Sequence, residues 1–211
     1  MLSLISGLAA PTEGAVLIDG KPVTGPNRKV GYMLQQDYLF EWRTIFDNAV
    51  LGAEIQGADM RRARERASQL LIRYGLGQFL HHLPRELSGG MRQRVALART
   101  LTTDPDVVLL DEPFSALDSQ TRLALADEVA EILRRERKTA ILVTHDIGEA
   151  ISMAERVIVL SRRPGQVKSN HTIRFTSAGE ARPAPLAARN TSEFNVYFRT
   201  LWQELEVHVE G

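Results

Sequence analysis

The second half of this 211-residue chain alternates short apolar runs with amphipathic segments, and this alternation most constrains its fold. Val107–Leu110 is wholly apolar, Thr139–Val143 nearly so, and each has the length of a strand. Between them, Ser119–Arg137 carries apolar residues at helical spacing on one face: Leu125, Val129, Ile132 and Leu133. Apolar strands that alternate with amphipathic helices are typical of a parallel sheet covered by helices on both faces. The sequence therefore predicts an α/β fold.

The same reasoning predicts elements along the rest of the chain. Helical spacing favours helices at residues 1–8, 61–74, 88–101, 147–154 and 193–205. Short apolar-rich runs favour strands at residues 15–18, 29–34, 156–160 and 166–175. Residues 178–189 are rich in Ala, Pro and Arg, which predicts a loop.

A helical block interrupts the strands in the first half of the chain. Thr44–Asp47, near its start, has the S/T-x-x-D/E form of a helix N-terminus. We therefore predict one domain over residues 1–211. It should contain a helical subdomain at about 37–101 and a C-terminal extension of strand, loop and helix at about 162–211.

The composition excludes several classes of function. Lys plus Arg and Asp plus Glu each number 26, so the chain lacks the basic excess of a nucleic-acid binder. With no cysteine, it cannot form thiolate metal sites, disulfides or a Cys nucleophile. No apolar run approaches the roughly 18 residues of a membrane span, and the apolar N-terminal stretch lacks the basic region of a signal peptide. If the protein works at a membrane, a partner must hold it there.

Two adjacent carboxylates, Asp111 and Glu112, close the apolar run VVLL. Open α/β sheets bind ligands at the carboxyl ends of their strands. There, one carboxylate can hold Mg²⁺ while its neighbour orients or deprotonates an attacking water. The alternative is an ordinary strand that ends in a polar turn, and the hexapeptide by itself does not decide between the two.

His145 follows the next predicted strand in the sequence VTHD. We expect it at the same edge of the sheet as Glu112, where an imidazole can hydrogen-bond a γ-phosphate and the attacking water. A lone histidine is more often a surface residue or a satisfied core residue, and its position one strand–helix unit after the acidic pair favours the functional interpretation.

The string LSGGMRQR, from Leu87 to Arg94, predicts an anion site. Ser88 is a good helix N-cap, and Gly89 and Gly90 allow a ligand to approach the backbone. The free N–H groups and positive dipole end of the following helix attract anions. Read as Ser-Gly-Gly only, the same residues are an unremarkable turn before a basic helix.

Four motifs follow one another along the chain: L-S-G-G-x-x-Q-R, V-V-L-L-D-E-P, S-A-L-D and V-T-H-D. In this order they resemble an ATP-binding subunit of an ABC transporter, and the resemblance covers essentially the whole chain. The resemblance implies a P-loop-NTPase-like fold, ATP hydrolysis, and ATP and Mg²⁺ as cofactors. It also implies that Ser88, Gly89, Gly90 and Met91 belong to the signature, which contacts the γ-phosphate of ATP held by the other subunit of a dimer.

The resemblance assigns the remaining site residues one by one. Asp111 matches the Mg²⁺-binding aspartate, Glu112 the general base and His145 the switch histidine. Asp118 belongs to the loop that communicates across the dimer. Gln35, preferred over Gln36 because of its spacing to Trp42-Arg43-Thr44, matches the glutamine that senses Mg²⁺ and the transmembrane partner.

Two further stretches, Leu39–Gly52 and Ser161–Val167, resemble importers of nitrate, sulfonate and taurine. The implied partners are a second ATP-binding subunit, transmembrane permease subunits and, indirectly, a solute-binding protein. The implied location is peripheral, at the cytoplasmic face of the cell membrane. Glu41 departs from the Pro that such importers usually carry before Trp42. Leu39, Phe40 and Trp42 either line the groove for the membrane subunit or belong to the core of the helical subdomain.

The phosphate loop G-x-x-x-x-G-K-S/T does not occur in these 211 residues. The resemblance implies that this loop and the strand feeding it precede Met1, so we expect an N-terminally truncated chain that binds ATP poorly and tends to aggregate. One alternative is a degenerate, non-catalytic subunit that acts as an interaction partner. Another is a soluble ABC ATPase of DNA repair, which the lack of heptads between Gln35 and Ser88 disfavours.

Overall fold

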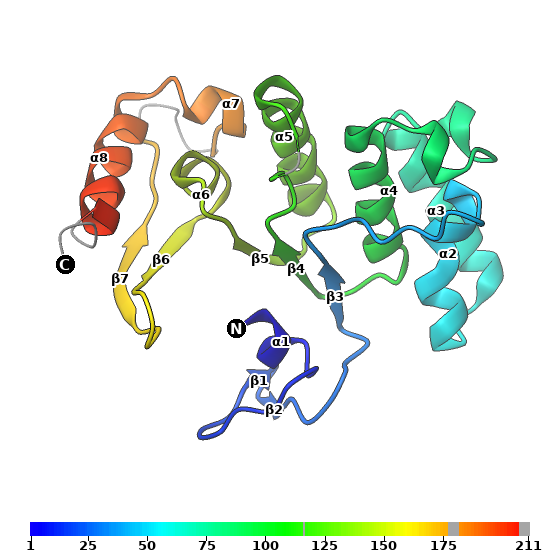
Figure 1. Cartoon of the computed structure of the whole chain (residues 1–211), viewed down its shortest axis with the longest axis horizontal. Helices are drawn as coiled ribbons and strands as arrows, with labels where there is room; N and C mark the ends of the chain where they lie inside the picture. The colour runs from blue at the N-terminus through cyan, green and yellow to red at the C-terminus, as the bar shows by residue number, and fades with distance from the viewer. Residues whose placement is uncertain (116, 177–181, 207–211) are drawn as a thin grey trace. The chain divides into compact units, whose positions relative to one another are not determined.

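A computed structural model describes residues 1–115, 117–176 and 182–206 (Figure 1). The chain divides into two compact units. The first is formed by Met1–Asp118 and Arg135–Val143, and the second by Ser119–Arg134 and Thr144–Gly211. Among the described residues, no helix combines the length and the apolar composition needed to cross a membrane.

The first unit is built on a three-stranded parallel sheet of order β3-β4-β5. Its strands are β3 (Val30–Met33), β4 (Val107–Asp111) and β5 (Thr139–Val143), and Val107 lies opposite both Val30 and Thr139. The central strand β4 buries Val108, Leu109 and Leu110. The parallel sheet predicted from the apolar runs is confirmed.

Strand β5 is more exposed than its apolar sequence suggests. Thr139 and Ala140 are exposed, and Ile141, Leu142 and Val143 are only half-buried. Within the described part of the chain, β4 is the strand that pairs with β5. This strand therefore forms an edge of the sheet, although strands of parallel sheets are normally buried on both faces.

Three helices of the first unit pack against one another beside the sheet (Figure 1). They are α2 (Ile45–Gln56), α3 (Met60–Arg73) and α4 (Gly89–Thr102), with short 3₁₀ turns at Gly77–Phe79 and Pro84–Glu86. The predicted helix start is confirmed, because Thr44 Oγ1 accepts a hydrogen bond of 3.1 Å from the Asp47 N–H. The apolar face predicted for α3 is buried: Ala63, Ala67, Leu70, Leu71 and Tyr74.

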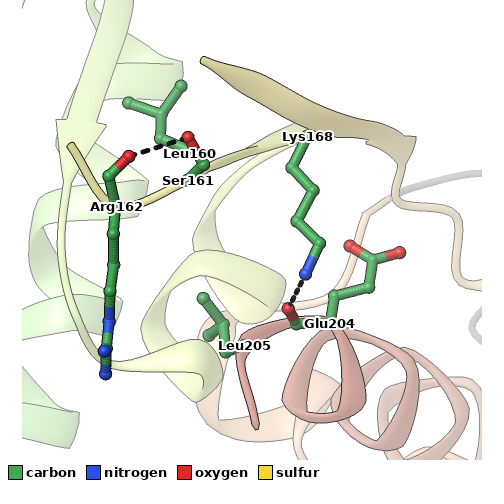
Figure 2. A pocket seen from close by; sticks show the side chains of 6 residues that line it. All are labelled: Leu160, Ser161, Arg162, Lys168, Glu204 and Leu205. Carbon is green, nitrogen blue, oxygen red and sulfur yellow. Dashed lines mark hydrogen bonds between the residues drawn. The ribbon is translucent and has the colours of Figure 1, made fainter. Parts of the chain in front are cut away.

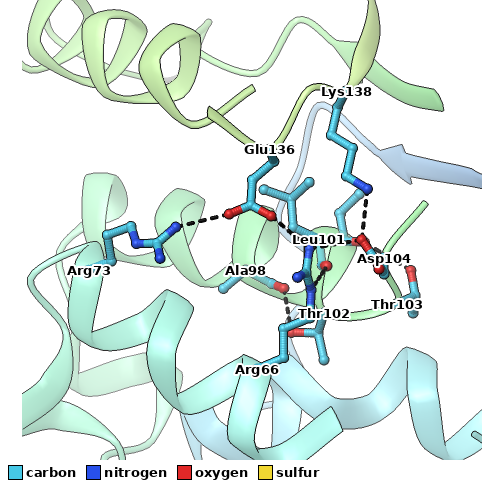
Figure 3. A network of polar contacts seen from close by, with 10 residues as sticks. Arg66, Arg73, Ala98, Leu101, Thr102, Thr103, Asp104, Glu136 and Lys138 are labelled. Carbon is cyan, nitrogen blue, oxygen red and sulfur yellow. Dashed lines mark hydrogen bonds and ion pairs between the residues drawn. The ribbon is translucent and has the colours of Figure 1, made fainter. Parts of the chain in front are cut away.

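A charged network joins α3 to the turn after α4 and to the turn before β5 (Figure 3). Arg66 Nη2 lies 3.0 Å from Asp104 Oδ1 and 3.1 Å from Glu136 Oε2. Arg73 Nη1 lies 3.0 Å from Glu136 Oε1, and Lys138 Nζ lies 2.7 Å from Asp104 Oδ1. Burial alone raises the pKa of Glu136, but its contacts with Arg73 and Arg66 outweigh burial and lower that pKa.

The N-terminal residues form a short helix and a hairpin: α1 (Leu2–Ile5), β1 (Leu17–Ile18) and β2 (Lys21–Pro22). Strand β2 was not predicted. The turn between the strands is Asp19-Gly20, with φ of 51° and 73°. Two consecutive residues with positive φ form the tight turn that Asp-Gly favours, so the dipeptide was the signal that identifies this hairpin.

The second unit contains α5 (Ser119–Arg135) except its last residue, together with α6 (Ile147–Met153) and α8 (Ser192–Glu206). These helices agree with the predicted ones. Strands β6 (Arg156–Leu160) and β7 (Val167–Thr172) pair antiparallel. The core packs residues from α6, β6, α8 and the connecting segments: Ile151, Val159, Ile173, Phe175, Ala188, Phe194 and Leu201.

The loop predicted for residues 178–189 is wrong in part. A short helix, α7, occupies Pro185–Ala188. Pro185 stands at its first position, where the missing N–H costs no helical hydrogen bond. Residues 178–181 of the predicted loop lie outside the described residues.

Candidate functional site

Asp111 and Glu112 lie at the carboxyl end of β4, as predicted. Asp111 Oδ2 accepts a hydrogen bond of 3.0 Å from Tyr32 Oη, which comes from the neighbouring strand β3. The Glu112 N–H donates to the Val143 carbonyl at the end of β5, over 2.9 Å. Glu112 has a φ of 46°, which is uncommon for a residue other than glycine and is concentrated at functional sites.

Sequence reasoning did not identify Tyr32 as a site residue. Tyr32 lies opposite Leu109 in the parallel register, which brings its hydroxyl to Asp111. Burial, and then the hydrogen bond to Asp111, raise the pKa of Tyr32, so its hydroxyl stays protonated and donates. A tyrosine three residues before Gln35 carries no local pattern that announces this contact.

Gln35 is linked to the turn that follows Glu112. Its Nε2 donates to Ser115 Oγ over 3.3 Å, and Ser115 Oγ donates to the Glu112 carbonyl over 3.0 Å. This bond uses the amide nitrogen of Gln35, so its amide oxygen takes no part in the contact with Ser115. The structure thus joins Gln35 and the acidic pair through one hydroxyl.

Ser88 caps α4 as predicted, with its Oγ accepting a hydrogen bond of 3.4 Å from the Met91 N–H. Gly89 and Gly90 form the first helical turn, and Ser88 and Gly89 are exposed. A Cβ atom on Gly89 would lie 3.8 Å from Leu117 Cδ2. The segment ending at Asp118 therefore passes beside the helix N-terminus, whose backbone N–H groups favour an anion.

His145 lies in a capped turn at the start of α6, in the second unit. Thr144 Oγ1 accepts from the Asp146 N–H over 3.0 Å and donates to Glu149 Oε2 over 2.7 Å. Asp146 Oδ1 in turn accepts from the Glu149 N–H over 2.9 Å. Because Glu112 belongs to the first unit, its approach to His145 stays a prediction.

The donors at the end of β4 fit Mg²⁺. Among the described residues there is no cluster of three or more His, Cys, Asp or Glu that could hold a metal by itself. Mg²⁺ usually takes one or two protein carboxylates and completes its shell with water and substrate phosphates. Tyr32 occupies only one carboxylate oxygen of Asp111. Asp111 and the amide oxygen of Gln35 could therefore hold the ion.

The apolar residues after Gln35 divide into two groups. Leu39 is buried and belongs to the core. Phe40 and Trp42 stack on each other with ring centroids 4.8 Å apart, and Trp42 is 76% exposed. Of the two interpretations of these residues, the core therefore holds for Leu39, while Phe40 and Trp42 are available at the surface.

The second unit also has a small cavity of about 160 Å³ beside β6, β7 and α8 (Figure 2). Its lining residues are Leu160, Ser161, Arg162, Lys168, Glu204 and Leu205. Lys168 Nζ donates to the Glu204 carbonyl there. None of the predicted site residues lines this cavity.

Comparison with known proteins identifies the family. Residues 1–115 match the family model described as "ABC transporter". The chain is 48% identical over 206 residues to the ABC transporter ATP-binding protein YtlC of Bacillus subtilis, and this match covers 97% of the chain and 78% of YtlC.

Two import proteins are also similar. The chain is 43% identical over 173 residues to the nitrate import ATP-binding protein NrtD of Synechocystis, covering 82% of the chain and 65% of NrtD. It is 40% identical over 179 residues to the taurine import ATP-binding protein TauB of Ruegeria pomeroyi, covering 85% of the chain and 67% of TauB. The chain thus spans about two thirds of the length of these relatives.

Among solved structures, the fold resembles the dimeric, post-hydrolysis ATP-binding cassette MJ0796 bound to ADP and Pi. The TM-score is 0.70 and the sequence identity 33%, over 82% of this chain and 79% of that one. The parallel sheet with its flanking helices agrees with this match. The chain belongs to the ABC transporter family of ATP-binding proteins.

Proposed function

We propose that this chain is an ATP-binding and ATP-hydrolysing subunit that energises a membrane importer of small anions such as nitrate, sulfonate or taurine. The observation that carries the proposal is the grouping at the end of β4, where Asp111, Glu112, Ser115 and Gln35 are linked. The similarity to NrtD and TauB supports the class of solute.

Each residue has a role in this proposal. Glu112 acts as the general base that orients and deprotonates the attacking water, and His145 hydrogen-bonds the γ-phosphate. Asp111 and Gln35 hold Mg²⁺, which neutralises charge on the phosphates when it is bound.

The first turn of α4, from Ser88 to Met91, contacts the γ-phosphate of ATP held by a second ATP-binding subunit. Asp118 belongs to the segment that communicates with that subunit. The dimeric state named for the MJ0796 cassette supports this arrangement.

The proposed partners follow from the exposed surface beside Gln35. Phe40 and Trp42 offer an apolar, stacked pair of rings that suits a helix of a transmembrane permease subunit. This contact holds the chain at the cytoplasmic face of the membrane, and a solute-binding protein acts through the permease.

A second candidate is a non-catalytic subunit that supplies only its signature. The observation in its favour is the exposed first turn of α4, which can serve ATP held by a partner subunit.

The two candidates are separated by Mg-ATP turnover in a complex of this chain with its permease and a second ATP-binding subunit. Ser88→Arg blocks the helix N-terminus, and Glu112→Gln removes the base, which contributes about 100-fold or more. Loss of turnover in both variants supports the catalytic proposal, whereas loss in Ser88→Arg only supports the non-catalytic one. Normal turnover in both overturns the assignment. Gln69→Arg and Glu65→Gln, on the exposed face of α3, serve as matched controls.

A further inference from the structure

Arg92, on α4, joins the segment after β3 to this helix by a three-part ion pair. Its Nε and Nη2 atoms each lie 2.9 Å from one carboxylate oxygen of Asp37. Its Nη1 atom lies 2.8 Å from Glu41 Oε1. All three guanidinium nitrogens are engaged, and the contact with Asp37 is bidentate, the geometry that fixes orientation most strongly.

The ion pair with Asp37 is sheltered from solvent. The side chain of Arg92 is 23% exposed and that of Asp37 is 19% exposed. Burial alone raises the pKa of Asp37, but the hydrogen bond from Arg92 and that from the Leu39 N–H outweigh burial and lower it. Asp37 is therefore charged, and its attraction to Arg92 is screened less than that of a surface pair.

Further contacts hold the backbone of the same segment. Arg99 donates to the Tyr38 carbonyl over 2.8 Å and to the Asp37 carbonyl over 2.6 Å. Gln93 Nε2 donates to the Gln35 carbonyl over 3.4 Å. Side chains of α4 thus contact both the side chains and the main chain of residues 35–41. We therefore expect this segment and the helix to move together.

Residues 35–41 and α4 together present two different surfaces. Arg92 directly follows the turn Ser88–Met91, which presents the anion-binding N–H groups. Glu41 lies between Phe40 and Trp42 in the sequence, and the rings of these two residues stack on each other at the surface. Of the α4 side chains that contact residues 35–41, Arg92 is nearest in the chain to Ser88–Gly90.

We propose that Arg92 is a positioning residue that transmits contact at Phe40 and Trp42 to the N-terminus of α4. A partner that displaces the aromatic pair also displaces Asp37 and Glu41. Because both acids are ion-paired to Arg92, Arg92 moves with them and shifts Ser88–Gly90. The proposal rests on the proposed function in one respect, namely that this N-terminus meets ATP.

The two acidic residues contribute unequally to the bridge. Asp37 makes the bidentate, sheltered contact, whereas Glu41 makes one contact and is 49% exposed. Exposed ion pairs are weak. We therefore expect Arg92→Met to change hydrogen exchange and turnover most, Asp37→Asn less, and Glu41→Gln least.

Hydrogen exchange of the isolated chain tests the mechanical link without nucleotide. In Arg92→Met we expect faster exchange both at residues 37–43 and at 88–92, with α4 residues 95–101 unchanged. Arg92→Lys keeps the charge but loses the bidentate contact and should fall between. Arg61→Met, on the exposed face of α3, is the control. Unchanged exchange at residues 88–92 in Arg92→Met overturns the proposal.

Turnover in the complex with permease and second ATP-binding subunit tests the transmission. We expect Trp42→Ala and Arg92→Met each to lower kcat by about 3- to 30-fold with little change in KM. Because both act on one path, the double variant should be no slower than Arg92→Met. Multiplied losses, or losses that track only the folded fraction, make Arg92 a purely structural residue. If the wild-type complex itself shows no turnover, the proposed function fails and the exchange experiment still decides on Arg92.

Discussion

Glu149, with only 3% of its surface exposed, supports the turn that carries His145. Burial is the largest influence on this carboxyl and raises its pKa, against the hydrogen bond from Thr144. At a pH between the unfolded and folded pKa values, the native state therefore holds a proton that the unfolded chain has released. The contribution of this proton to stability is complete below the unfolded pKa and is lost as pH rises through the folded pKa.

Above the ordinary Glu pKa, the stability of the wild type should fall as the pH rises. We expect this fall to be shallower in Glu149→Gln. The glutamine carbonyl can still accept the hydrogen bond from Thr144, so the turn should persist. Urea unfolding midpoints measured from pH 4 to 8 read this out. Glu131→Gln, at an exposed position of α5, should keep the wild-type slope. Identical slopes in all three proteins would contradict the assignment of this pH dependence to Glu149.

Among the elements, β5 combines an interior sequence with an edge position. Its neighbour β4 pairs with one side, and its residues Thr139–Val143 are exposed or half-buried. Long apolar edges recruit further strands, and natural proteins block this with charges, Lys above all. We therefore expect the purified chain to associate at high concentration through this strand.

Ala140→Lys tests this expectation, because Ala140 is exposed on β5. The added charge should shift the sedimentation of the chain toward the monomer at concentrations where the wild type associates, with little change in unfolding midpoint. Gln78→Lys adds the same charge at an exposed site outside the sheet and should not have this effect. Association that persists unchanged in Ala140→Lys would show that another surface is responsible.

Most helices and strands could be predicted because their determinants are local. The spacing of Ala63, Ala67, Leu70 and Leu71 already defines the buried face of α3. The hairpin at Asp19-Gly20 was equally local and was overlooked. In contrast, the pair of Asp37 and Arg92 joins residues 55 positions apart, and only the packed fold brings them together.

At the scale of the whole chain, charged contacts connect segments of the first unit that are far apart in the sequence. Arg66 joins α3 to Asp104 and Glu136, and its Nε also donates to the Leu101 carbonyl over 3.0 Å. Removing one donor that serves several half-buried acceptors leaves each of them less well satisfied.

We expect Arg66→Met to lower the free energy of unfolding by about 1–3 kcal/mol. Denaturant unfolding followed by circular dichroism measures this change. Arg61→Met removes an exposed arginine from the same helix and should cost less than about 0.5 kcal/mol. Equal losses in the two variants would mean that the network contributes no more than general surface charge.

The ion pair centred on Arg92 also has a consequence for inheritance. Positions 37, 41 and 92 share one guanidinium, so a substitution at one changes what selection tolerates at the other two. If Arg92 is substituted, Asp37 is left with an unpaired charge that lowers the stability of the fold. Selection then no longer favours an acid at position 37. Glu41 makes a single contact and is 49% exposed, so it can change while Asp37 and Arg92 remain. The three codons should therefore drift as a group, with 41 the freest among them.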